Sequence, residues 1–206
     1  QNATLEDVRS FYEQWYGPNN ATMVIAGDIS PRAVKKMVEK YFGEIKKGPE
    51  IKNPEPWHVT LETTKKVFHE DNFARSPRLS MSFPTVNQLD DDAPALELLG
   101  QLLGDGKKAP LYKVIVEDRK LAPNISSFSR TQEIAGTFNI SSTAFPTTNL
   151  TDVENSIFDA FEMFEKEGFT IEDLDRLKAK YETGFYSGIS SILNKAFQLG
   201  LYNEYY

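Results

Sequence analysis

Residues 11–31 read FYEQWYGPNNATMVIAGDISP, and the fold prediction starts from this stretch. Phe11 and Trp15 continue an apolar face at helical spacing, and Gly17-Pro18 ends that helix. Thr22–Ala26 is a short apolar run bounded by turn residues, which predicts a buried strand. Ser30-Pro31 is typical of a helix start, because a capping residue is followed by proline at the first helical position. The stretch therefore predicts a helix–strand–helix unit.

Farther along the chain, residues 47–58 contain three prolines among charged residues, which predicts a linker. After the linker, strand patterns alternate with helix patterns in pairs. The predicted strands are 59–70, 78–83, 124–131 and 136–144, and the predicted helices begin near residues 92, 110, 151 and 170. Paired hairpins and paired helices predict an α+β fold with an antiparallel or mixed sheet and helices packed on one face. We expect three parts: a terminal α-β-α piece of an upstream domain (1–46), a proline-rich linker (47–58) and a complete domain (59–206).

Composition narrows the classes of function. The 206 residues carry a formal net charge of -7, whereas nucleic-acid binding requires a basic face. There is no cysteine, which excludes disulfides and thiolate zinc sites, and no apolar run is long enough to span a membrane. Composition leaves the compartment open, and we expect a periplasmic or other soluble location. The chain opens on Gln1, which favours a fragment of a longer precursor.

Two motifs resemble signatures of the M16 zinc peptidases, the family of insulinase, pitrilysin and mitochondrial processing peptidase. The first is residues 11–31 followed by the helix ending Tyr41-Phe42-Gly43, and the second is residues 103–113, which continue to Lys120-Leu121-Ala122. The two motifs stand in the order and at the separation of the family. The resemblance covers nearly the whole chain.

The resemblance implies duplicated α+β domains that enclose a chamber, with zinc in the first domain. There a His-x-x-Glu-His motif and a later Glu hold the metal, and the motif's Glu acts as general base. The only histidines here are His58 and His69, eleven positions apart, and neither belongs to such a motif. We therefore expect no metal and no catalytic residue in this chain, and zinc in the parent protein.

The resemblance also implies an Arg and a Tyr that bind the substrate carbonyl in the non-zinc half of the family. The corresponding positions here are Val116 and Pro123, and neither side chain can donate a hydrogen bond. This assigns the chain to the C-terminal domain of the zinc-bearing half. The expected partners are the upstream zinc domain, the other half of the protease and a peptide substrate.

Lys107, Lys108 and Tyr112 are the candidate substrate-binding residues, as part of the chamber wall. The alternative for the lysines is an exposed turn. Gly104-x-Gly106-Lys107 also invites comparison with a phosphate-binding loop, but the full motif is absent and the loop is predicted to join two helices.

The sequence leaves two functions open. The first is a non-catalytic, structural and substrate-enclosing domain of an M16-type metalloendopeptidase, inactive in proteolysis by itself. The alternative is a scaffold or peptide-binding homologue without protease activity. In either case the strand Thr22–Ala26 would present unpaired edges without its upstream domain. We expect residues 1–46 to dock on the rest of the chain or to mediate an oligomer.

Overall fold

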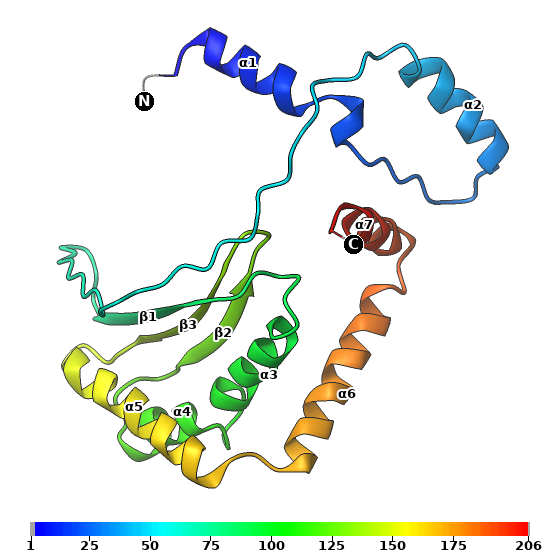
Figure 1. The fold of residues 1–206 in the computed structure, drawn as a ribbon. Coiled ribbons are helices and arrows are strands. Elements are labelled where there is room, and N and C mark those ends of the chain that lie inside the picture. Colours follow the sequence, from blue (N-terminus) through cyan, green and yellow to red (C-terminus); the bar gives the residue numbers. More distant parts are fainter. Residues whose placement is uncertain (1–2, 206) are drawn as a thin grey trace. The chain divides into compact units, whose positions relative to one another are not determined.

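The computed structural model describes residues 3–205, which form two compact units. One unit is Glu55–Ala179, and the other combines the residues up to Pro54 with those from Lys180 onward. Figure 1 labels the α-helices and the strands. The elements are α1 (Leu5–Trp15), the 3-10 turn η1 (Pro18–Asn20), α2 (Pro31–Phe42), β1 (Arg78–Thr85), α3 (Ala93–Gly104), α4 (Pro110–Tyr112), the π-helix η2 (Lys113–Asp118), β2 (Ser126–Thr131), β3 (Gly136–Thr143), α5 (Leu150–Glu167), α6 (Ile171–Gly188) and α7 (Ile192–Tyr205).

The unit Glu55–Ala179 is built on a three-stranded antiparallel sheet in the order β1-β3-β2. Strand β3 is central, and its residues are buried at every second position. Met81 of β1 and Ser127 of β2 lie opposite Ile140 of β3, so these three side chains share one face. In Figure 1, α3, α4 and α5 lie on the same side of this sheet. The α+β class with helices on one face is confirmed.

The core of this unit lies between the sheet and those helices. Phe138 and Ile140 of β3 belong to the same buried cluster as Leu111 of α4 and Ile157 of α5. The full buried cluster is Leu103, Leu111, Val114, Ile115, Ala122, Ile125, Phe138, Ile140, Ala144, Val153, Ile157 and Ala160. Since β3 supplies core residues at alternating positions, its register determines which sheet face is covered.

Helix α3 approaches strand β2 through two glycines. A Cβ atom at Gly100 would lie 3.0 Å from the Cα of Phe128, and one at Gly104 would lie 3.0 Å from the nitrogen of Ser127. The Oγ of Ser127 donates a 2.6 Å hydrogen bond to the carbonyl oxygen of Gly100. The absence of side chains on this face of α3 therefore permits contact between helix and strand backbones.

In the N-terminal part of the chain, side chains hold the ends of the elements. Thr4 and Asp7 form a reciprocal capping box at the start of α1, as expected for this sequence pattern. Asn20 donates to the carbonyl oxygen of Trp15 at the end of that helix. Asn19 accepts from the nitrogen of Gly48, which ties the chain after α2 back to the 3-10 turn. Such contacts explain why two asparagines follow the proline of the first motif.

Two predicted strands are absent from the described residues. Residues 22–26 pair with no strand, and Met23 and Ile25 are about half exposed. Residues 59–70 likewise form neither strand nor helix. Both predictions were wrong in this structure because an apolar run becomes a strand only where another strand completes its hydrogen bonds. The side chain of Thr22 instead accepts a hydrogen bond from Asn203 of α7, within the same unit.

Candidate functional site

The sheet face opposite the helices is polar and largely exposed. Ser80, Ser141 and Ser126 lie side by side across the three strands, and Ser82 and Asn139 form the next row. The Oγ of Ser82 donates to Oδ1 of Asn139 at 2.7 Å, and the Oγ atoms of Ser126 and Ser141 are 3.1 Å apart. We call this surface, from Ser80 and Ser82 across to Ser126 and Phe128, the open face.

Phe128, 46% exposed, is the large aromatic side chain of the open face, and Arg78 and Arg130 lie on the same face. An exposed ring among hydroxyl groups, with cationic side chains nearby, is able to contact an extended polypeptide without a deep pocket. The sequence carried a signal for this surface, because serines alternate with apolar residues in 78–83. The alternation predicts a half-buried strand. The rows of polar side chains across β1, β3 and β2 follow only from the pairing register of the three strands.

The predicted substrate-binding residues lie elsewhere in the same unit. Lys107 and Lys108 are exposed in the turn between α3 and α4, and Tyr112 is half-buried at the end of α4. The turn joins two helices, so the phosphate-loop alternative lacks the required strand before the loop. Gly106 has a φ of 92°, which suits glycine in a tight turn.

Lys108 borders a charged hollow of about 540 Å³ that also involves the start of α6. The side chain and backbone of Thr170 hydrogen-bond Asp173 and lower its pKa below the ordinary carboxyl value, and Arg176 and Lys108 act in the same direction. Thr170 and Asp173 thereby form the capping interaction of α6. The hollow contains both signs of charge, with acids at Asp105, Glu167, Glu172 and Asp173 and cations at Lys108, Lys113 and Arg176. A hollow that contains both signs of charge does not favour binding of either an anion or a cation.

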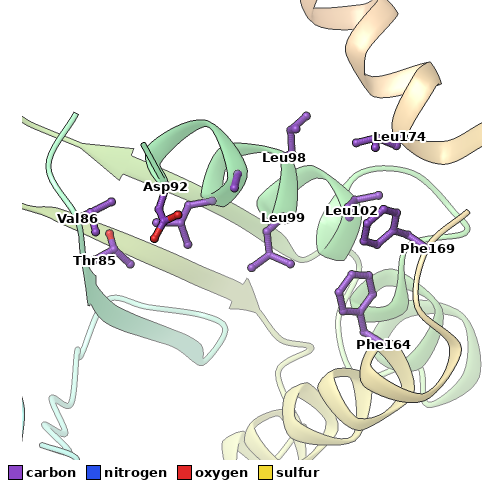
Figure 2. A pocket seen from close by; sticks show the side chains of 11 residues that line it. Thr85, Val86, Asp92, Leu98, Leu99, Leu102, Phe164, Phe169 and Leu174 are labelled. Atoms are coloured by element: carbon purple, nitrogen blue, oxygen red, sulfur yellow. The ribbon is translucent and has the colours of Figure 1, made fainter. Parts of the chain in front are cut away.

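An apolar cavity of about 550 Å³ lies between α3 and the loop from α5 to α6. Figure 2 shows Leu99 and Leu102 of α3 near Phe164, Phe169 and Leu174. The remaining lining residues are Thr85, Val86, Asp92, Ala95, Leu96 and Leu98. The sequence predicts a helix that begins near residue 92, but the cavity itself depends on residues far along the chain, such as Phe164 and Phe169.

No group of three His, Cys, Asp or Glu side chains able to hold a metal is found in residues 3–205. His58 and His69 are both exposed. Val116 is half-buried and packs against the core, while Pro123 is exposed. The described residues therefore do not fit a catalytic zinc site. Among the described helices, none combines the length and apolar character needed to cross a membrane.

Comparison with known proteins agrees with this picture. The zinc protease PqqE of Helicobacter pylori is 26% identical over 208 residues, covering 100% of this chain and 46% of that protein. The crystal structure of a protease from Helicobacter pylori superposes with a TM-score of 0.82 at 24% identity, covering 99% of this chain and 50% of that one. A peptidase M16 inactive domain from Pseudomonas fluorescens gives a TM-score of 0.78 at 22% identity, covering 99% of this chain and 48% of that one.

The chain thus spans about half the length of these relatives. Residues 2–181 match the sequence profile of the family described as peptidase M16 inactive domain. That description agrees with the missing metal ligands, and the structural matches agree with the fold. This chain belongs to the M16 peptidase family, as an inactive domain of that family.

Proposed function

We propose that this chain is the non-catalytic, substrate-enclosing domain of an M16-type zinc metalloendopeptidase, with the open face as part of the chamber wall. The open face carries the proposal. A sheet with hydroxyl groups on one side and the hydrophobic core on the other can form a chamber wall whose inner surface contacts water. Hydroxyl and amide groups can also exchange hydrogen bonds with many different peptides. Lys107, Lys108 and Tyr112 remain candidates for contacts outside this face.

The partner in this proposal is an upstream zinc domain of the same protein, within the zinc-bearing half. Support comes from the apolar side chains that α1 and the following residues leave exposed. Leu5 is 78% exposed, and Phe11, Tyr12, Met23 and Ile25 are about half exposed or more. Apolar surface of this extent marks an interaction site in soluble proteins. In this proposal the zinc and the general base of the parent protein lie in that upstream domain. Two relatives are named zinc proteases, which supports zinc in the parent protein.

The test uses the full-length parent protein with a bulky residue on the open face. Ser82→Trp should slow cleavage of casein more than cleavage of a short fluorogenic peptide, because only a long substrate must pass the wall. Asn155→Trp, at an exposed position of α5 on the helical side, is the matched control. Equal effects of both variants on both substrates would contradict the role of the open face.

The 206-residue chain provides a second test. It should bind no stoichiometric zinc and should show no chelator-sensitive casein hydrolysis. Either activity in the isolated chain would overturn its assignment as non-catalytic. An intact His-x-x-Glu-His upstream in the parent sequence is expected, and its absence would favour the scaffold alternative.

The alternative of a peptide-binding homologue has one specific observation in its favour. Strands β1 and β2 each pair only with β3 among the described residues, so the three-stranded sheet has two edges. An extended peptide can add to such an edge through backbone hydrogen bonds. Slowed amide exchange in Arg78–Thr85 on addition of a peptide would support this mode, and unchanged exchange would argue against it.

A further inference from the structure

The open face carries positive charge and no negative charge, although the chain as a whole is acidic. Its rows of side chains are Arg78–Thr143, Ser80–Ser141–Ser126, Ser82–Asn139–Phe128 and Pro84–Thr137–Arg130. None of these positions holds Asp or Glu, whereas the sequence contains 30 acidic residues and has a net charge of -7. In the sequence, the acidic residue closest to these rows is Glu133, in the turn between β2 and β3.

Both arginines of the open face are exposed, and they lie at diagonally opposite corners. Within residues 3–205, neither Arg78 nor Arg130 forms a salt bridge or a side-chain hydrogen bond. Two arginines outside the sheet are paired, in contrast, because Arg119 contacts Asp159 and Arg176 contacts Asp173. A guanidinium without an internal carboxylate keeps its planar donors available for a carboxylate of another molecule. The two corners are therefore places where the face can bind anionic groups.

The spacing of these groups suits an extended polypeptide. Phe128 and Arg130 are two residues apart on β2, so their Cα atoms are about 7 Å apart on one face. Arg78 lies about 20 Å away along the sheet, because six positions of β1 separate it from Pro84 in the row of Arg130. About six residues of an extended chain span that length. A segment on this face can place an apolar side chain against Phe128 and carboxylates toward both corners.

We propose that the open face selects acidic, extended segments of polypeptide substrates. In this proposal Arg78 and Arg130 contact substrate carboxylates, and Phe128 contacts an apolar or aromatic side chain. The inference rests on the proposed function, because it takes the open face to be part of the chamber wall. Charge complementarity carries it: a lysine-rich segment would bring cations toward two unpaired guanidinium groups, with no carboxylate on the face to bind them. Selection therefore uses repulsion of basic segments as well as attraction of acidic ones.

The test compares two long substrates of the full-length parent protein. One is casein, which is anionic at neutral pH, and the other is casein made cationic by coupling ethylenediamine to its carboxyl groups. The double variant Arg78→Gln/Arg130→Gln should lower kcat/KM for casein by about two- to fivefold for each arginine, as expected for exposed ion pairs. The same variant should leave kcat/KM for the cationic casein unchanged or raise it. The loss should shrink as salt rises, because exposed charges are screened.

Lys166→Gln is the matched control, because it removes one positive charge from an exposed position of α5 on the helical side. It should leave the ratio of the two kcat/KM values unchanged. The same unchanged ratio in the double arginine variant would overturn the selection of acidic segments. If Ser82→Trp still slowed casein cleavage more than Asn155→Trp, only the substrate class would fall and the chamber wall would stand. If Ser82→Trp also had no specific effect, both would fall.

Two further measurements exclude other occupants of the open face. Analytical ultracentrifugation of the parent protein should show the same oligomeric state with and without the two arginines. Dissociation of an oligomer in the double variant would show that a second copy covers the face. Thermal unfolding should give the same melting temperature for the double variant as for Lys166→Gln. A clearly lower value would show that the face packs against another part of the parent protein, and either result would overturn the proposal.

Discussion

Substitution of Gly100 by alanine tests whether α3 packs directly on the backbone of β2. Helix propensity alone predicts stabilisation by about 1 kcal/mol, because alanine is the better helix former. The structure predicts the opposite result. The new Cβ would meet the Cα of Phe128 at 3.0 Å and the carbonyl oxygen of Ser127 at 3.3 Å. Both atoms belong to the strand backbone, which cannot move aside as a flexible side chain would.

Overpacking of this kind costs about 1–3 kcal/mol. After the gain in propensity is subtracted, Gly100→Ala should destabilise its unit by up to about 2 kcal/mol. For a domain of this size each kcal/mol corresponds to about 2–4 °C in melting temperature. Gly184→Ala in α6 is the matched control, because, apart from its chain neighbours and the adjacent backbone of its own helix, no heavy atom of the described residues lies within 4 Å of its added Cβ. That variant should gain about 1 kcal/mol.

The two glycines lie in different units, so each helix needs a readout of its own. Amide hydrogen exchange in native conditions provides one, since it reports the local opening free energy of each segment. Gly100→Ala should speed exchange in Ser126–Thr131, whereas Gly184→Ala should slow exchange in the second half of α6. If Gly100→Ala stabilised its unit as Gly184→Ala does, the close approach of α3 and β2 would be wrong.

Three further predictions concern single side chains. Ser127→Ala should destabilise the unit by about 1 kcal/mol, because it removes a hydrogen bond to the α3 backbone. Ser129→Ala should leave the stability unchanged or increase it, because the buried Oγ of Ser129 has no hydrogen-bond partner among the described residues. Urea unfolding of the two variants distinguishes these outcomes. Ile140→Ala should cost about 2–5 kcal/mol in the same measurement, because its side chain is fully buried at the centre of the core, and a cost below 1 kcal/mol would contradict that position. Thr170→Ala should raise the pKa of Asp173 toward the ordinary carboxyl value in an NMR titration. The pKa of Asp173 is lower in the folded state than in the unfolded state, so its interaction with Thr170 stabilises the fold above the unfolded pKa of about 3.9. This stabilisation is lost as the pH falls through the folded pKa. An unchanged pKa in the variant would show that the cap does not form.

Most elements of the unit Glu55–Ala179 were predictable from local patterns. Alternation in 78–83 predicted β1, and the residues before α6 predicted its capping box. These features depend on contacts within a few residues, so the local sequence contains the necessary information. The start of α5 was less clear, because the pattern predicts a helix that begins near residue 151, whereas α5 begins at Leu150 with Asn149 as its cap, accepting from the nitrogen of Thr151. Neighbouring capping residues compete for the same backbone groups.

The strands predicted at 22–26 and 59–70 show where local patterns stop being sufficient. Their apolar content suits a strand, but a strand is completed by hydrogen bonds to a neighbouring strand, which can be distant in the sequence. The open face has the same dependence, because its rows of serines arise from the register of three strands that are distant in sequence. The cavity depends on α3 and on the loop after α5, which are separated by more than sixty residues.

By itself, the amino-acid sequence determined the family, the α+β class, the missing zinc motif and the positions of most helices. Each of these is carried by residue types at short, regular spacings, or by the absence of a residue type. Only the tertiary structure decided which apolar runs become strands, which sheet face stays open and where α3 meets β2. These features require backbone partners and side-chain contacts between distant segments, and the free energy of those contacts is not contained in any local pattern.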